Sequence, residues 1–195
     1  KTAYEIRNCD WSSDVCSSDL PAVVSELRRR APGLQLRVHE GASERLASEV
    51  ADQELAQAIV TEPVVDERLD VEHLLEEDLV VLIPDDPVLL GGARHVLADG
   101  PVGLADLVGQ RLILPPRANP LRTEVELAAR AAGIELDVPL EVEGVRLIPD
   151  LVAAGVGVTI MPETAAPVGL PGVRSVPMSD MPPRRLALVT ARGGS

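Results

Sequence analysis

The most constraining feature of this sequence is the alternation of helical patterns with short apolar strands that starts at Pro21. In residues 21–30, Val23, Val24 and Leu27 fall on one helical face. Strands are predicted at residues 34–38, 55–60, 69–75, 79–83, 111–114, 141–143, 157–161, 173–176 and 186–190, and further helices at 43–51, 120–132 and 145–154. This order predicts an α/β protein with mainly parallel sheets, whose ligands bind outside the carboxyl ends of the strands.

Residues 120–132 carry the clearest helix signals in the chain. Asn119 is a suitable N-cap, Pro120 suits the first helical position, and Gly133 is suited to the position just past the end. These three signals depend only on local sequence, so we expect this helix whatever surrounds it.

Charge and hydropathy argue against two classes of function. The formal net charge is −13, so nucleic acid would be repelled on average, and the run Arg28-Arg29-Arg30 spreads around a helix instead of forming one basic face. The longest uncharged apolar runs, residues 79–83 and 156–161, are far too short to cross a bilayer. We therefore expect a soluble chain that binds neither nucleic acid nor membrane by itself.

The first twenty residues differ from the rest of the chain. They contain the only tryptophan and tyrosine and both cysteines (Trp11, Tyr4, Cys9 and Cys16), in a Ser- and Asp-rich stretch in which we find neither a strand nor a helix period. The phrase CDWSSDVCSSDL looks like translated sequencing-adapter DNA; the alternative is a disordered natural tail. The stretch lacks the pattern of a signal peptide, and its cysteine spacing matches no zinc site. We expect residues 1–20 to lie outside the fold.

The sequence offers no catalytic signature. It has no G-x-S-x-G, H-E-x-x-H, P-loop or complete G-x-G-x-x-G motif, and its three histidines, His39, His73 and His95, are scattered among solvated carboxylates. We predict no catalytic residue, no cofactor and no metal site.

Small polar residues do gather at predicted strand ends and helix starts. Ser43 is placed to cap the helix over 43–51, Thr61 follows a strand, Asn119 precedes a helix, and Gly144 follows the strand at 141–143. Helix N-termini present unpaired N–H groups and the positive end of a dipole, so several that point at one place would hold a carboxylate or similar anion.

From Pro21 to Thr190 the order of motifs resembles one known family. The matching phrases are LRRRAPGLQLRVHEG, LAQAIV, LLEEDLVVLIP, RLILPPRANPLR, LEVEGVRLIPDLVAAGVGVTIMP and RRLALV. Their order and spacing resemble the effector-binding domain of LysR-type transcriptional regulators, which has the type 2 periplasmic-binding-protein fold.

The resemblance implies two Rossmann-like lobes joined by two crossover strands, with the effector between them and hinge closure as the switch. Lobe I would comprise residues 21–83 and 165–195, and lobe II residues 84–164. By position in the family, the effector would be contacted by Ser43, Thr61, Pro116, Ala118, Asn119 and Gly144. Dimers in this family pair a first-lobe helix with a second-lobe helix, here around Leu27 and Leu127.

The sequence also departs from the family pattern. The usual opening strand is missing, as is the C-terminal helix, so we expect a fold that is incomplete at both ends and only marginally stable, because a lost central strand exposes a sheet edge. Gln53 and Ala56 stand where the family usually has glycine and aspartate. The winged helix-turn-helix of the family is not found in this chain.

We therefore expect the effector-sensing and dimerisation part of a cytoplasmic LysR-type regulator. It would bind a small anionic molecule, form a homodimer or tetramer, and reach DNA only through the missing winged helix-turn-helix. The main alternative is a solute-binding protein of the same fold. An enzyme such as a dehydratase is a more distant one.

Overall fold

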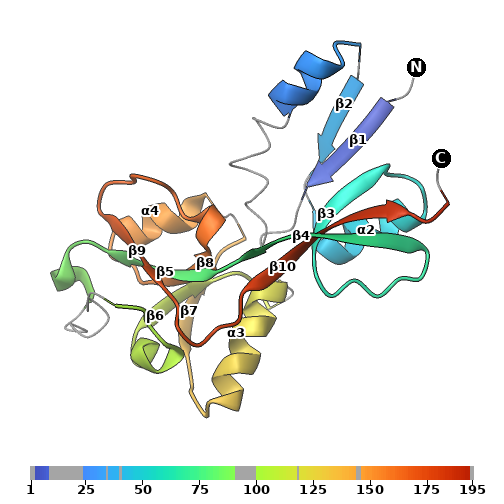
Figure 1. Cartoon of the computed structure of the whole chain (residues 1–195). Coiled ribbons are helices and arrows are strands. Elements are labelled where there is room, and N and C mark those ends of the chain that lie inside the picture. Colours follow the sequence, from blue (N-terminus) through green and yellow to red (C-terminus); the bar gives the residue numbers. More distant parts are fainter. Residues whose placement is uncertain are drawn as a thin grey trace. The chain divides into compact units, whose positions relative to one another are not determined.

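The computed structural model describes residues 3–8, 24–33, 35–39, 41–90, 100–117, 119–143 and 146–193. The chain forms two compact units. The first comprises Lys1–Glu77 and Arg184–Ser195, and the second comprises Asp78–Pro183. The prediction of an α/β protein is confirmed, because each unit combines sheet and helix (Figure 1).

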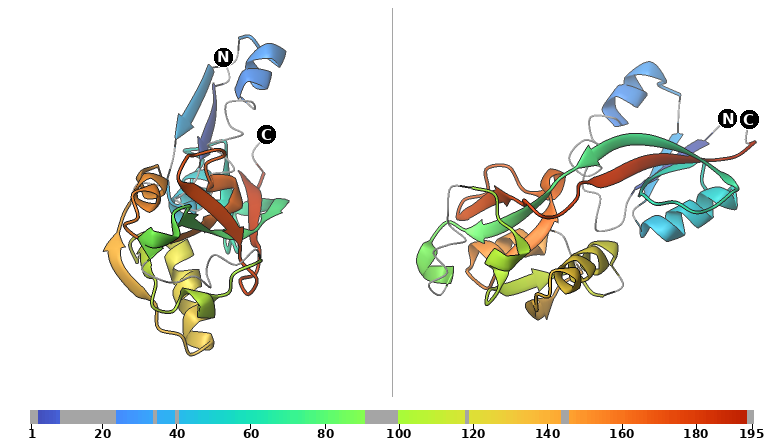
Figure 2. Two further views of the ribbon diagram at one scale, coloured as in Figure 1. Left: turned by 90° about the vertical axis from the view of Figure 1, so that its left-hand side faces the viewer. Right: turned by 60° about the horizontal axis from the view of Figure 1, so that its bottom comes forward.

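The first unit is built on a five-stranded sheet in the order β2-β1-β3-β10-β4. Strands β1 and β2 are parallel, as are β1 and β3, whereas β10 runs antiparallel to both β3 and β4. The right-hand view of Figure 2 shows β4 and β10 side by side as a long antiparallel ribbon. The strands are β1 (Ala3–Asn8), β2 (Gln35–His39), β3 (Gln57–Thr61), β4 (Leu69–Glu77) and β10 (Arg184–Ala191).

Strand β1 corrects the prediction that the opening strand is missing and, for residues 3–8 alone, the prediction that they lie outside the fold; residues 9–20 are outside the described part of the chain. Its backbone pairs with β2 on one side, with Ala3 opposite Gln35, and with β3 on the other, with Ile6 opposite Gln57. Tyr4 and Ile6 alternate with polar neighbours, which is the period of a strand. The gap between β2 and β3 is filled, so the expected exposed edge, and with it the argument for marginal stability, does not hold.

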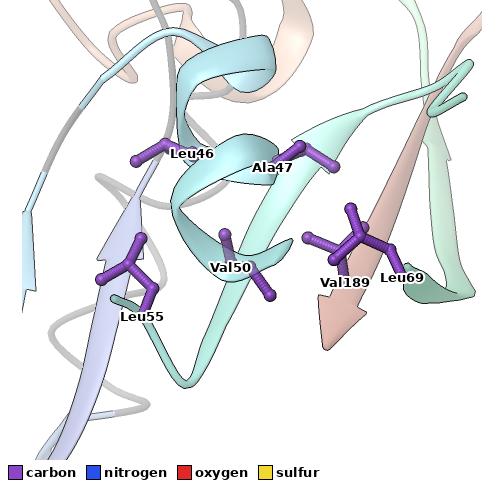
Figure 3. Close-up of a cluster of buried hydrophobic side chains, with 8 residues drawn as sticks. Leu46, Ala47, Val50, Leu55, Leu69 and Val189 are labelled. Atoms are coloured by element: carbon purple, nitrogen blue, oxygen red, sulfur yellow. The ribbon is translucent and has the colours of Figure 1, made fainter. Parts of the chain in front are cut away.

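Helix α2 (Ser43–Ala51) packs against this sheet. Leu46, Ala47 and Val50 recur at helical spacing on its buried face. Figure 3 shows these side chains gathered with Leu55 after the helix, Leu69 at the start of β4 and Val189 on β10. At about 1.5 to 3 kcal/mol for each fully buried Leu or Val, this cluster is a main source of stability for the first unit.

The first predicted helix is also present. Residues 24–30 are helical and end at the turn after Ala31; the predicted start at Pro21 lies outside the described residues. On its exposed side Glu26 forms ion pairs with Arg29 and Arg30, each at 2.6 Å.

The second unit contains an antiparallel sheet in the order β8-β5-β9 and a parallel pair, β6-β7. The strands are β5 (Leu79–Pro84), β6 (Arg111–Leu114), β7 (Asp137–Glu141), β8 (Thr159–Pro162) and β9 (Val173–Pro177). Helices α3 (Pro120–Ala131) and α4 (Leu147–Ala153) accompany them, with short 3-10 turns at Pro87–Leu90, Leu104–Leu107 and Glu163–Ala165. The expectation of a mainly parallel sheet in each lobe is thus wrong for this unit.

Two further details differ from the sequence predictions. The unit boundaries fall at Glu77 and Arg184 instead of near residues 83 and 165, because β5 and β9 hydrogen-bond with each other and β5 also pairs with β8. Strand β7 lies at Asp137–Glu141 and not at 141–143. It contains Pro139, which argues against a strand in sequence but is tolerated at an edge, and β6 is the only partner of β7 among the described strands.

Within the described part of the chain, no helix is both long and apolar enough to cross a membrane.

Candidate functional site

In the first unit the structure brings together two of the residues selected from the sequence, Ser43 and Thr61. Ser43 was expected to cap α2, but the N-cap is Ala42, and Ser43 is the first helical residue. The Ser43 Oγ instead accepts a hydrogen bond from the backbone N–H of Thr61 at 3.1 Å. The Ser43 side chain therefore links the start of α2 to the end of β3 instead of capping the helix.

A buried ion pair adjoins Thr61. The Arg184 Nη1 lies 3.4 Å from the Glu77 Oε1, and the two side chains are only 2% and 1% exposed. Arg184 also donates from Nη2 to the Thr61 Oγ1 at 3.2 Å. Because Arg184 is the donor in that bond, the Thr61 hydroxyl is held as an acceptor on this side, and its own proton points elsewhere.

Sequence reasoning missed both Glu77 and Arg184. They stand 107 positions apart, and only the antiparallel register of β4 and β10 sets them opposite each other. The available signal was that each is a charged residue bordering an apolar strand, in LLEEDLVVLIP and RRLALV. Charged residues are almost never fully buried unless they are paired, so the burial of one would have required the other.

The second unit holds the other proposed effector contacts. Asn119 is the N-cap of α3, as predicted: its Oδ1 accepts from the Leu121 N–H at 2.9 Å, Pro120 occupies the first turn, and Gly133 follows the helix at φ +70°. Pro116 is half-buried, and its carbonyl accepts from the Asn119 N–H. Ala118 and Gly144 lie outside the described residues.

Arg122 on α3 is a third charged residue that sequence reasoning missed. Its side chain is 4% exposed. The Nε donates to the Glu126 Oε1 at 2.7 Å, and Nη1 contacts the Pro115 carbonyl at 3.1 Å and the Glu141 Oε1 at 3.4 Å. One guanidinium thus ties α3 to residues at the ends of β6 and β7.

Arg122 also fixes the charge of Glu126. Its hydrogen bond is the largest effect and lowers the pKa of the Glu126 carboxyl below the ordinary value of 4.5. Burial opposes this, and the nearby charges of Arg122, Arg117 and Arg130 add to the lowering. Glu126 is therefore a carboxylate at neutral pH.

Groups that could bind a metal do not converge in the part of the chain that the structure describes. There, no three His, Cys, Asp or Glu side chains are arranged to hold a metal ion. The imidazole of His73 lies 3.2 Å from the Glu62 carboxylate in a surface pair, and His95 is outside the described residues.

The residues expected at a dimer surface lie on the two helices named for it. Leu27 is half-buried on the helix at residues 24–30, and Leu127 is 58% exposed on α3. The pairing of these helices between two copies of the chain stays a prediction.

The chain is similar to known proteins in both sequence and structure. A family model described as "LysR substrate binding domain" matches residues 11–195. A curated relative, the "Probable hydrogen peroxide-inducible genes activator" of Mycobacterium avium, is 30% identical over 150 residues, which is 76% of this chain and 46% of the relative. A second, the "Hydrogen peroxide-inducible genes activator" of Dickeya chrysanthemi, is 25% identical over 90% of this chain and 56% of its own length. This chain spans about half the length of these relatives.

Two solved structures share the fold. The BenM effector-binding domain with its effector benzoate aligns with a TM-score of 0.81 and 20% identity, covering 98% of this chain and 84% of that one. The regulatory domain of Synechocystis PCC6803 CcmR in complex with 2-PG aligns with a TM-score of 0.81 and 18% identity, covering all of this chain and 90% of that one.

Proposed function

Because this chain belongs to the family of LysR substrate-binding domains, we propose that it senses a small anionic effector for a transcription regulator. The relatives are named as gene activators, so the family is regulatory and not enzymatic. A solute-binding protein of the same fold is not favoured, because the family model and the curated relatives are those of regulators.

The observation that carries the proposal is the start of α2. The helix begins at Ser43, and its N-cap, Ala42, offers no side-chain cap. The Ser43 Oγ accepts from the Thr61 N–H at the end of β3, and the guanidinium of Arg184 donates to the Thr61 hydroxyl. Backbone N–H groups in the first turn of a helix carry the positive end of the helix dipole. This combination favours an anion at Ser43 and Thr61, although the chain as a whole carries a net charge of −13.

The effector class follows the same chemistry. A carboxylate accepts hydrogen bonds from helix N–H groups and from a hydroxyl, and the BenM domain holds benzoate, a carboxylate. The remaining proposed contacts, Pro116, Ala118, Asn119 and Gly144, come from the second unit and rest on the family resemblance.

The test is calorimetric titration of the chain with a panel of small carboxylates that includes benzoate. We expect at least one to bind, and we expect Thr61→Val, which removes the hydroxyl but keeps the shape, to weaken it about tenfold or more, the equivalent of one hydrogen bond to a charged group. If Thr61→Val binds every tested carboxylate as tightly as the unaltered chain does, the proposed site is wrong.

We also propose the assembly and the setting of the whole protein. Two or four copies would associate through the helices that carry Leu27 and Leu127, and the whole cytoplasmic protein would bind DNA through a winged helix-turn-helix. Leu127→Glu should shift the chain toward the monomer in sedimentation analysis, whereas Val65→Glu, at an exposed valine of the first unit, should not. Equal sedimentation of both variants would contradict this interface.

A response to peroxide is a second candidate function, because the curated relatives are named as hydrogen peroxide-inducible genes activators. The chain has two cysteines, Cys9 and Cys16, and none after them. A thiol-based response of this chain would have to use one or both. Thiol titration after peroxide treatment distinguishes the candidates. Peroxide is the signal if it oxidises these thiols and changes DNA binding by the whole protein. The double variant Cys9→Ser/Cys16→Ser should then abolish that change.

A further inference from the structure

A second group of charged residues lies apart from Ser43 and Thr61, in a pocket of the second unit. The pocket has a volume of about 380 Å³ and is formed by α3 and the segment that leads into β7. Its lining residues are Arg117, Arg122, Glu126, Ala129, Arg130, Ile134, Glu135, Leu136 and Val138. The volume is within the range of about 300 to 1,000 Å³ that is usual for small-molecule sites.

The pocket gathers three arginines although the chain is acidic. Three guanidinium groups surround one carboxylate: the Glu126 oxygens lie 2.7 Å from Arg122, 3.5 Å from Arg117 and 3.6 Å from Arg130. Glu135 is the other acidic residue of the lining, and Glu141, just outside it, also pairs with Arg122 at 3.4 Å. Such a cluster of guanidinium groups is unusual in a chain whose net charge is −13, and its N–H donors can pair with a small anion.

Arg122 supplies donors for such an anion. Its side chain is 4% exposed, and its Nε and Nη1 bond to Glu126, Pro115 and Glu141. An arginine has five N–H donors, and among the described residues none accepts from the two on Nη2. Buried donors are rarely left without a partner, so a ligand oxygen in this pocket would complete the set.

The rest of the lining is apolar. Ala129 on α3, Ile134 and Leu136 in the connecting segment, and Val138 on β7 form a smaller apolar patch beside the charged groups. A bare inorganic anion would leave this surface unfilled, whereas a carboxylate with an apolar body would cover it.

We propose that the pocket between α3 and β7 is a second ligand site, separate from the effector site at Ser43 and Thr61, and that it binds an organic monocarboxylate. The carboxylate pairs with Arg122, Arg117 and Arg130, and the apolar body packs on Ile134, Leu136 and Val138. The site lies wholly within the second unit, so it does not depend on the proposed effector site.

The test is an NMR titration of the full chain with benzoate as the probe, followed through the backbone amides of residues 129–138. We expect these amides to shift in a saturable way. The double variant Arg117→Gln/Arg130→Gln should weaken binding about tenfold or more; both side chains are about three-quarters exposed, so the fold should survive their loss. Arg111→Gln, an exposed arginine of the same unit outside the pocket, is the matched control and should bind normally. Benzyl alcohol, which lacks the charge, should not saturate the site.

Three results would overturn the proposal. One is the absence of shifts at residues 129–138 up to about 10 mM benzoate, because a dissociation constant above that value would be too weak for a ligand site. Another is equal binding by the double variant and the unaltered chain, and the third is equal binding of benzyl alcohol. Thr61→Val separates the two sites: it should leave the shifts at 129–138 intact, so this site can fail while the proposed effector site stands, or the reverse.

Discussion

Removing Glu77 from the buried Glu77–Arg184 pair should destabilise the first unit severely. The two side chains are 1% and 2% exposed, so Glu77→Leu would leave the Arg184 guanidinium without its carboxylate in a place that water does not reach. Breaking one side of a buried pair costs about 3 to 5 kcal/mol, because the remaining charge keeps its desolvation penalty. For a chain of this size we expect the thermal midpoint to fall by about 6 to 20 °C, at 2 to 4 °C per kcal/mol.

The double variant Glu77→Leu/Arg184→Met distinguishes this explanation from a simple loss of packing. It removes both charges and keeps apolar volume, and such replacements are often neutral. It also loses the bond from Arg184 to the Thr61 hydroxyl, for which we allow about 1 to 3 kcal/mol. We therefore expect the double variant to be no less stable than Glu77→Leu alone, with a coupling energy of at least about 2 kcal/mol.

Urea denaturation followed by far-UV circular dichroism measures these free energies of unfolding, and hydrogen exchange in β4 and β10 shows that the loss is local to the first unit. The reasoning would be refuted if Glu77→Leu cost less than about 1 kcal/mol, the usual value for an exposed pair. It would also be refuted if the stability losses of Glu77→Leu and Arg184→Met, measured separately, added up to the loss in the double variant. Calorimetric titration should show weaker carboxylate binding in the double variant, because Thr61 loses the group that orients it.

Three further predictions concern local features. Gln53 is held at φ +60°, so Gln53→Gly should raise the free energy of unfolding in urea by about 0.5 to 1 kcal/mol; no gain would mean that the turn is unstrained. Asn119→Ala should cost about 1 kcal/mol by the same assay, because it frees the Leu121 N–H, and Asn119→Ser should restore most of it. The pKa of Glu126 is lowered in the folded chain, so the ionised carboxylate stabilises the fold above its ordinary pKa of 4.5, and this stabilisation is lost as the pH falls through the lowered value. In Glu126→Gln the free energy of unfolding should therefore fall less steeply in acid. An unchanged dependence on pH would contradict the pairing with Arg122.

Local chemistry made part of this fold predictable from sequence. Helix α3 begins and ends where Asn119, Pro120 and Gly133 indicate, since caps and left-handed turns depend on residues within one helical turn. Residues 79–83 form a fully buried strand, as their unbroken run of apolar side chains indicates. The family could be named from the order of such segments.

Tertiary structure decided the features that depend on partners distant in sequence. β5 belongs to the second unit because its hydrogen bonds go to β8 and β9, and β1 is a strand because β2 and β3 offer it backbone partners on both sides. Such pairings join segments whose separation leaves no periodic trace in the sequence.

The same limit applied to the candidate site. Ser43 could be selected as a polar residue at a helix start, but its bond to the Thr61 N–H, 18 positions away, could not. The pairing of Glu77 with Arg184 required the register of two antiparallel strands. A sequence displays which groups are polar and which helices can form, whereas the identity of a buried group's partner is fixed only when the folded chain excludes water from both.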